Sequence, residues 1–244
     1  MISMRIKCGS MSVSTQPDFG TNFSGIFLVS YGLLYNFYAA TDPRNITAAG
    51  WHVPSDTEFW TLVKYLDPAA IWGNNTAGGQ VKEVGVYWNT PNIDATNSSG
   101  FNGRGAGLRE STGAFTDFKV RLFLWNSNEY GPTDGEYSSC TRLTGILTTS
   151  GGGGWIGNPK IWGMSVRPIR DSTILTHGQI GSYTGNDGKI YRTICIGTQE
   201  WLADNLCETL YRDGSPIPEV TDNAAWAALS TGALCVFNND WSYI

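Results

Sequence analysis

The clearest periodic pattern of apolar residues lies at 51–68, in WHVPSDTEFWTLVKYLDP. Ser55 is followed three residues later by Glu58, which is the spacing of a capping box and predicts that a helix begins there. Apolar residues then recur at intervals of three and four, so one face of this helix should be buried. The residues of that face are Phe59, Leu62, Val63 and Leu66. Pro68 should end the helix, because proline cannot continue it.

The C-terminal part of the chain carries a strand pattern after a strong turn signal. In KIYRTICIGTQEWLADNL the apolar residues alternate, which places Ile190, Ile194 and Ile196 on one side of a strand. The preceding Asn186-Asp187-Gly188 is typical of a tight hairpin turn. A second tight turn is predicted at Asp213-Gly214.

A second helix is predicted over 221–232, in TDNAAWAALSTG. Either Thr221 or Asp222 can cap its start, and Gly232 suits its end. Trp226 and Leu229 should face inward.

Three other stretches have weaker patterns. Residues 25–40 are apolar and aromatic, and they fit either one or two buried strands or a strand entering a short helix. VKEVGVYW at 81–88 predicts a strand. Five glycines at 100–115 predict tight turns, with Arg109 and Glu110 as a structural ion pair. GFNGRG in this stretch lacks the strand–loop–helix context and the GK[ST] of a phosphate-binding loop.

The segment 121–170 combines apolar ends with a polar and aromatic middle. It opens on LFLW and closes on apolar residues around Met164 and Val166, while the middle is rich in Asn, Ser, Thr, Gly, Tyr and Trp. Tyr and Trp offer large contact areas at low entropic cost, and Ser, Gly and Asn adapt their hydrogen bonds. This pattern indicates core strands that carry a displayed binding surface.

Composition narrows the class of protein. The 244 residues suffice for one large domain or two small ones, and only 15% are charged while 13% are aromatic and 30 are glycine. Such a chain favours a loop-rich fold over a helical one. A net charge of −5 and a pI near 5.0 lack the basic footprint of a nucleic-acid-binding protein. No apolar run is long enough to span a membrane, and the N-terminal residues lack the apolar core of a signal peptide.

Candidate metal ligands and nucleophiles are few. The five cysteines show no paired spacing, and we expect them to be small buried residues, with at most one disulfide among Cys8, Cys140, Cys195, Cys207 and Cys235. The only histidines are His52 and His177, so no metal centre or cofactor is expected. His52 stands beside Trp51 and Pro54 and is interpreted as a packed, hydrogen-bonded structural residue rather than a ligand or base.

Several longer segments of the sequence, taken together, match a known family sequence pattern. They cover most of 31–240 and are DGKIYRTICIGTQEWLADNL, DGSPIPEVTDNAAWAALSTGALCVFNND, YGLLYNFYAA, GWHVPSDTEFWTLVKYL, GLRESTGAF, LWNSNEY and GMSVRPIRD. In these segments the chain resembles the Fibrobacter succinogenes major paralogous domain family. The resemblance implies an α+β, C-type-lectin-like fold related to the formylglycine-generating-enzyme group. We therefore expect a loop-rich domain with two main helices around small antiparallel sheets.

The order of these segments along the chain differs from that in the family. The segments DGKIYRTICIG and TDNAAWAALSTG open the family's usual sequence but lie near the C-terminus here. We therefore predict an N-terminal arm at 1–24 and one circularly permuted domain at 25–244, in which 186–244 is equivalent to the family's N-terminal third. In that arrangement residues 241–244 would lie near residues 27–31. Exchange of 186–244 between two copies remains the alternative.

The resemblance also assigns a role to 121–170. The family is similar to the variable proteins of diversity-generating retroelements, in which the segment before a GxSVRP-like end forms the ligand-binding face. Carried over, the candidate contact residues are Asn126, Asn128, Tyr130, Thr133, Asp134, Tyr137, Trp155, Asn158, Lys160 and Trp162. Trp125, Met164 and Val166 are expected to belong to the scaffold.

The resulting functional expectation is a non-enzymatic receptor-binding protein of a phage tail, which recognises a host-surface protein or glycan. Its arm would dock to other virion proteins, and the chain could also form a homo-oligomer. The alternatives are a bacterial cell-surface adhesin, a structural virion subunit without a ligand, and an enzyme of the formylglycine-generating type. The last needs a cysteine pair that the spacing does not provide. Trp125-Asn126 is followed by Ser127, so the Trp-Asn-Asp pattern of calcium-dependent lectins is missing, although Asn238-Asn239-Asp240 has oxygens for a structural ion.

Overall fold

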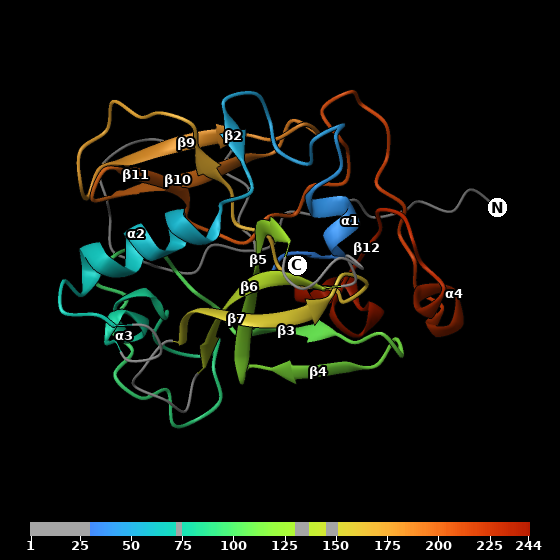
Figure 1. The fold of residues 1–244 in the computed structure, drawn as a ribbon, viewed down its shortest axis with the longest axis horizontal. Coiled ribbons are helices and arrows are strands. Elements are labelled where there is room, and N and C mark those ends of the chain that lie inside the picture. Colours follow the sequence, from blue (N-terminus) through green and yellow to red (C-terminus); the bar gives the residue numbers. More distant parts are fainter. Residues whose placement is uncertain (1–29, 72–74, 130–136, 145–150) are drawn as a thin grey trace.

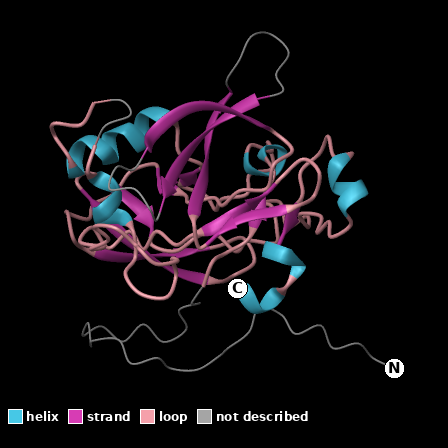
Figure 2. Cartoon of the chain, turned by 90° about the horizontal axis from the view of Figure 1, so that it is seen from below, coloured by secondary structure: helices cyan, strands magenta, loops and turns pink. Residues whose placement is uncertain are grey.

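Two five-stranded sheets with short helices around them make up the described part of the chain (Figure 1). The computed structural model describes residues 30–71, 75–129, 137–144 and 151–244, with the backbone alone for 137–144 and 151–157. Loops and turns connect most of the strands, as Figure 2 shows. This is a mixed α/β architecture with few helices and mainly antiparallel sheets, so the predicted class is confirmed at that level.

The first sheet combines strands from both ends of the described chain. Its order is β2-β8-β11-β10-β9, and every neighbouring pair is antiparallel. The strands are β2 (Trp51–His52), β8 (Ile169–Arg170), β9 (Ile180–Thr184), β10 (Ile190–Ile196) and β11 (Gln199–Leu202). A small separate pair joins β1 (Leu34–Tyr35) to β12 (Leu234–Cys235). Residues after 170 are thus an integral part of the fold.

The second sheet carries the segment of interest. Its order is β4-β3-β5-β6-β7, antiparallel except between β3 and β5. The strands are β3 (Ala106–Arg109), β4 (Phe115–Phe118), β5 (Arg121–Glu129), β6 (Tyr137–Thr144) and β7 (Gly151–Pro159). The helices are α1 (Phe37–Ala40), α2 (Asp56–Leu66), α3 (Ala77–Val81) and α4 (Asn223–Ala227), followed by the 3-10 turns η1 (Phe237–Asn239) and η2 (Trp241–Tyr243). No helix in these described ranges is long and apolar enough to cross a bilayer.

Helix α2 forms as its sequence predicts. The side chain of Ser55 accepts a hydrogen bond from the N–H of Glu58, and the Glu58 carboxylate accepts one from the N–H of Ser55, which completes the capping box. Phe59, Leu62 and Val63 are buried, and Leu66 packs partly buried against the same core. The predicted helix, its cap and its buried face are confirmed.

The predicted hairpin is also confirmed. Strands β9 and β10 pair on either side of Asn186-Asp187-Gly188, and Gly188 takes the left-handed φ of 83° that a tight turn requires. A distant carboxylate holds this turn, since Glu208 accepts hydrogen bonds from the N–H groups of Asn186 (2.6 Å) and Asp187 (3.0 Å). The turn at Asp213-Gly214 is confirmed as well, with Gly214 at φ 82° and a β-bridge between Leu210 and Pro216.

Four expectations need correction or refinement. The predicted strand at 81–88 is wrong, because α3 ends at Val81 and Gly85, at φ 98°, turns the chain where the strand would run. The second helix is shorter than 221–232: Asp222 caps it and Trp226 is buried, but it ends at Ala227. Residues 25–40 follow the strand-then-helix alternative in their described part, as β1 and α1. The pair between Arg109 and Glu110 does not form, as described below.

The C-terminal residues pack against the start of the described chain. The N–H of Tyr31 donates to the carbonyl of Tyr243 at 3.1 Å, and the two rings lie 6.4 Å apart. The ring of Phe118 lies 4.6 Å from Tyr31 and 4.8 Å from Tyr243, so a cluster of aromatic side chains covers this meeting point. The predicted proximity of 241–244 to the described end of 27–31 is confirmed.

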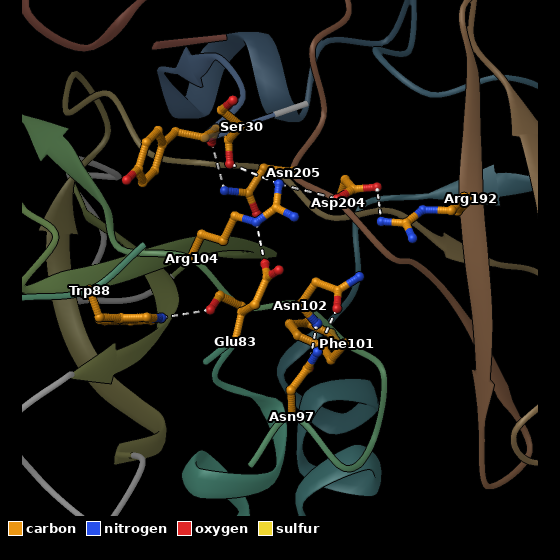
Figure 3. Close-up of polar contacts among 12 residues, drawn as sticks. Ser30, Glu83, Trp88, Asn97, Phe101, Asn102, Arg104, Arg192, Asp204 and Asn205 are labelled. Carbon is orange, nitrogen blue, oxygen red and sulfur yellow. Dashed lines mark hydrogen bonds and ion pairs between the residues drawn. The ribbon is translucent and has the colours of Figure 1, made fainter. Parts of the chain in front are cut away.

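Buried charges join segments that are far apart in the sequence (Figure 3). Arg104 bonds to Glu83 and donates to the carbonyl of Ser30 at 3.0 Å, and its Nη1 lies 3.4 Å from an Oδ of Asp204. The other Oδ of Asp204 lies 3.4 Å from Nη2 of Arg192. The cluster therefore connects the start of the described chain with the loop before β3 and the segment after β11.

A second arginine lies beside this group. Arg167 is fully buried, donates to the carbonyl of Phe101 and to Oδ1 of Asn205 (2.7 Å), and stacks its guanidinium over the Phe101 ring. Burial lowers the pKa of Arg167 to about 9. Asn205 in turn donates to the carbonyl of Tyr31 at 2.8 Å, so Arg167 and Asn205 fix the same entry point of the chain.

Candidate functional site

Strand β5 changes from buried to exposed along its length. Residues 122–126 are buried, whereas 127–129 are exposed. The strand pairs with β6 up to Trp125↔Cys140, and the register then shifts before Glu129↔Ser138. Such an irregularity bends and twists a strand and often redirects its side chains. The exposed end of β5 therefore projects from a firmly packed base.

Trp125 forms that base. Its ring is fully buried, its Nε1–H donates to the carbonyl of Tyr35 at 2.7 Å, and it meets the ring of Phe37 edge to face at 5.4 Å. Its backbone N–H donates to the carbonyl of Ser165 at 3.0 Å. The expectation that Trp125 belongs to the scaffold is confirmed.

The closing part of the segment is equally buried. Residues 163–169 lie in the interior, with Met164 and Val166 fully buried as predicted. Gly163 exchanges two backbone hydrogen bonds with Arg109, at 2.8 and 2.9 Å. A Cβ at Gly163 would lie 3.0 Å from the Trp226 ring and 3.2 Å from Cβ of Arg109, so any larger residue would press against both neighbours.

The exposed end of β5 is tied to the N-terminus of α2. Asn126 is fully buried and donates through its Nδ2 to Asp56. Asn128 is exposed, and its Oδ1 accepts a hydrogen bond from the N–H of Asp56 at 2.8 Å. The N–H of Ser127 donates to the carbonyl of Pro54 at 2.8 Å. These bonds give an N–H of the helix start an acceptor and tie the exposed end of β5 to the start of α2.

Lys160 and Trp162, which lie after β7, form further contacts in and around this segment. Nζ of Lys160 lies 2.8 Å from Oε1 of Glu129 and 5.4 Å above the Phe37 ring. The lysine is nearly buried while the Glu129 side chain is 65% exposed, so the carboxylate is the group that faces solvent. Trp162 is partly buried and donates from Nε1 to Oγ of Ser111 at 2.9 Å.

The ten candidate contact residues thus fall into three groups. Asn128 is exposed and Trp162 is partly exposed, so both have surface for a ligand. Asn126, Asn158 and Lys160 are buried at 0%, 3% and 9% exposure, and we assign them to the support beneath the face. The side chains of Tyr130, Thr133, Asp134, Tyr137 and Trp155 lie outside the described residues. The support also uses Asp56, Phe37 and Ser111, which no sequence motif marked.

His52 lies at the base of α2 between two carboxylates. Its Nε2 is 2.8 Å from Oε1 of Glu58 and its Nδ1 is 2.6 Å from Oδ1 of Asp171. The hydrogen bond with Glu58, together with Asp171, raises the pKa of His52 to about 9. Burial raises the pKa of Glu58, but His52 and Ser55 outweigh it and lower that pKa to about 2. The structural interpretation of His52 agrees with this geometry.

The variant His52→Gln should lose stability in a pH-dependent way. Because the folded-state pKa of His52 is raised above 6.5, its contribution is complete below pH 6.5 and is lost as the pH rises through about 9. His52 is 38% exposed, and solvent screening limits the effect to roughly 0.5–1 kcal/mol. Urea unfolding of both proteins at pH 6 and at pH 9.5 should show a smaller difference at the higher pH. An equal difference at both pH values would contradict the role of charge.

Possible metal ligands and nucleophiles among the described residues do not form a cluster. Within the described ranges no group of three or more His, Cys, Asp or Glu side chains is placed to hold a metal ion. Cys195, Cys207 and Cys235 are buried, as small apolar residues would be. Asn238 and Asn239 take left-handed backbone angles, Asn239 donates to the carbonyl of Thr221, and Asp240 caps η2.

Arg109 has a structural role, because it links β3 to distant parts of the backbone. It donates to the carbonyls of Gly113 (3.1 Å), Val220 (2.5 Å) and Thr221 (2.9 Å), and its guanidinium stacks on Trp226 at 4.4 Å. The predicted partner, Glu110, instead accepts a hydrogen bond from Thr116. The sequence-based pairing was wrong because Glu110 lies just after the end of β3, while the guanidinium of Arg109 bonds to backbone carbonyls, two of them in the distant segment before α4.

Comparison with known proteins identifies one relationship. The family model described as the Fibrobacter succinogenes major domain matches residues 19–170, which is more than half of the chain and includes the whole of 121–170. No curated protein and no solved structure gives a match. The proposed equivalence of 186–244 to the family's opening third lies outside the matched span and stays a prediction.

Proposed function

The chain belongs to the Fibrobacter succinogenes major domain family, and on that premise we propose that it is a non-enzymatic ligand-binding protein. Its binding face is formed by the exposed part of 121–170, carried on a circularly permuted, C-type-lectin-like scaffold. The observation that carries this proposal is the course of β5, in which a fully buried base continues into an exposed end. A recognition surface needs both parts, because a rigid support reduces the entropy lost on binding.

The chemistry of the face supports a contact surface rather than a reaction centre. Asn128 and Glu129 are exposed at the end of β5, and Trp162 contributes a partly exposed ring. The sequence adds Tyr130 and Trp155, and Tyr, Trp and Asn are residues that adaptable binding surfaces favour. Aromatic side chains should supply most of the binding energy.

We propose a host-surface protein or glycan as the ligand and the tail of a phage virion as the setting. This rests on the similarity of the sequence to retroelement-diversified variable proteins, with residues 1–24 as the segment that docks to other virion proteins. An adhesin on a bacterial surface would use the same face. A near-copy of the DNA for 121–170 that differs at adenines and lies beside a reverse transcriptase gene would support a diversified binder.

The thiol chemistry of the described cysteines favours binding over catalysis. A formylglycine-generating type of reaction needs a reactive cysteine pair, and reactivity requires a lowered thiol pKa. Burial raises the pKa of Cys195, and it raises that of Cys235 to about 12. These thiols therefore stay protonated at neutral pH, which is the opposite of what a nucleophile or metal ligand needs.

Replacing aromatic residues of the proposed face should weaken capture of the ligand. We expect the variant Tyr130→Ala/Trp155→Ala to lose at least tenfold in binding to envelope fractions of candidate host bacteria, since hot-spot aromatics each contribute about 2 kcal/mol or more. Binding is measured by pull-down and then by biolayer interferometry with the full chain. Thermal unfolding of the same samples shows whether the fold is intact.

The matched control is Trp241→Ala, which removes a 38% exposed tryptophan of the C-terminal 3-10 turn. It should bind like the unchanged chain, since Trp241 belongs to η2 and not to 121–170. Equal binding by the double variant and the unchanged chain would reject this face. A loss of binding with Trp241→Ala alone would move the ligand to the C-terminal surface.

A further inference from the structure

The outer strands of the two sheets differ in how they are protected against pairing. Exposed sheet edges in natural proteins usually carry charges, prolines, bulges or very short strands. Strand β2 has only two residues and contains His52. In β4, Asp117 takes a φ of 62° and Phe118 is stacked against Phe237 at 4.5 Å. Strand β7 pairs with β6 through two register shifts and ends at Pro159.

Strand β9 has none of these protections. It forms the outer margin of the first sheet (Figure 1), and all five of its residues pair with β10 in an unbroken antiparallel register. Its sequence, Ile-Gly-Ser-Tyr-Thr, contains no charge and no proline. Among the described strands at sheet margins, β9 is therefore the one best suited to accept another strand.

The register shows which backbone groups point outward. The N–H of Gly185 donates to the carbonyl of Lys189, and the N–H of Cys195 donates to the carbonyl of Gln179. Hydrogen-bonded pairs alternate along an antiparallel ladder, so Gly181 and Tyr183 also bond to β10, while Ile180, Ser182 and Thr184 direct their N–H and C=O groups away from it. Within the described ranges no hydrogen bond from another segment reaches these outward groups.

The inner side of β9 holds the strand in a fixed position. Tyr183 is buried, its ring lies 5.0 Å from that of Trp51 and 5.6 Å from that of Tyr191, and its hydroxyl accepts a hydrogen bond from the N–H of Ala48. At Gly181 a Cβ would lie 2.7 Å from Oγ1 of Thr193, so the strand packs closely there. Leu175, in the segment before β9, lies on this inner face, where its carbonyl accepts the Cys195 thiol and its side chain would lie 3.0 Å from a Cβ at Gly181. The outward groups are thus presented on a rigid strand.

We propose that β9 pairs antiparallel with β9 of a second copy of this chain, which joins the two first sheets into one continuous sheet. A two-fold axis at Ser182 would place Ser182 opposite its own copy and Ile180 opposite Thr184. Such a pairing is self-complementary, as a symmetric dimer requires. The side chains of Ile180, Ser182 and Thr184, which share one face of the sheet, are neutral, so no like charges within β9 would meet across the pair. Ile180, which is 45% exposed, would gain a β-branched neighbour.

The dimer would present two copies of the proposed binding face. Strand β9 belongs to the first sheet, whereas β5, β6 and β7 belong to the second, so the pairing uses none of the strands that carry the proposed face. Two linked faces bind a repetitive surface more tightly than one, because the second contact is intramolecular. The pairing itself rests on β9 alone and does not depend on the identity of the ligand.

Sedimentation velocity of the full chain over about a hundredfold range of concentration tests the proposal. We expect a weak, concentration-dependent dimer, since a single strand pair buries a small area. The variant Ser182→Lys places two ammonium groups opposite each other and should raise the dissociation constant at least tenfold. Ser182→Pro removes only an outward N–H and should have a similar effect. Ser182→Thr keeps a neutral strand former and should dimerise like the unchanged chain.

Amide hydrogen exchange separates the remaining outcomes. In the dimer, the amides of Ile180, Ser182 and Thr184 should become protected as concentration rises, while those of Gly181 and Tyr183 are protected throughout. A monomer in which the three outward amides exchange freely at every concentration would overturn the proposal. A monomer in which they are always protected would overturn it too, because a segment of the same chain would then cover β9. A dimer that persists in Ser182→Lys and Ser182→Pro would place the interface elsewhere.

Discussion

Replacing Arg109 with methionine should lower the free energy of unfolding by about 3–5 kcal/mol. Arg109 is fully buried, and its donors satisfy the carbonyls of Gly113, Val220 and Thr221. Methionine fills a similar volume but donates no hydrogen bond, so the carbonyls of Gly113 and Val220 would lose the Arg109 donor in a low-dielectric surrounding, while that of Thr221 would keep only its bond from Asn239. The segment that leads into α4 would also lose its link to β3.

The effect is measured by urea unfolding and by the melting temperature, which should fall by about 10 °C. The matched control is Arg212→Met, because Arg212 also donates to three carbonyls, those of Thr47, Ala48 and Trp51. Arg212 is exposed, so water can replace its hydrogen bonds, and the loss should stay below about 1 kcal/mol. Similar losses in the two variants would show that burial does not decide the contribution of Arg109.

Local signals in the sequence predicted those elements whose cause is local. The capping box of Ser55 and Glu58 and the turn at Gly188 depend on residues within a few positions of each other, and both formed as expected. The strand predicted at 81–88 failed because its apolar residues are not in a sheet at all. Val84 and Val86 are 53% and 73% exposed in a turn around Gly85, so residues with high strand propensity face solvent there.

Long-range contacts could not be predicted from one sequence. Two of the partners of Arg109, Val220 and Thr221, lie more than 100 positions away. The partners of Asp204 include the similarly distant Arg104. No spacing in the sequence indicates that these residues are in contact. Burial of polar residues in 121–170 could not be predicted for the same reason, since Asn126 is fully buried and bonds to Asp56 on α2, which is distant in the sequence. The family resemblance assigned the proposed face to 121–170 but could not tell which of its residues are exposed and which are buried.

Replacing Trp125 with alanine should cost about 3–5 kcal/mol and disturb the proposed binding face at the same time. The ring is fully buried, so its removal leaves a cavity between β5 and the segment of Tyr35 and Phe37. The carbonyl of Tyr35 also loses the indole N–H that donates to it at 2.7 Å. Urea unfolding measures the first effect. Amide exchange at Ser127, whose N–H bonds to Pro54, reports on the second.

Two further variants separate packing from hydrogen bonding at this position. Trp125→Phe keeps much of the ring volume but not the N–H, so it should recover about half of the lost stability. Trp201→Ala removes an equally buried tryptophan that packs on Phe59 and Phe101, in the core beneath α2. It should destabilise the fold by a similar amount without a selective increase in exchange at Ser127.

Comparing Trp125→Ala with Trp201→Ala tests whether the exposed end of β5 depends on the tryptophan directly beneath it. If Trp125→Ala and Trp201→Ala increase exchange at Ser127 equally, the exposed end of β5 has no dedicated support. A selective increase in Trp125→Ala would show that this tryptophan sets the direction in which β5 leaves the sheet. Substitutions at the exposed Asn128 and Glu129 would then alter the surface at little cost in stability, because the buried residues before them hold the strand in place.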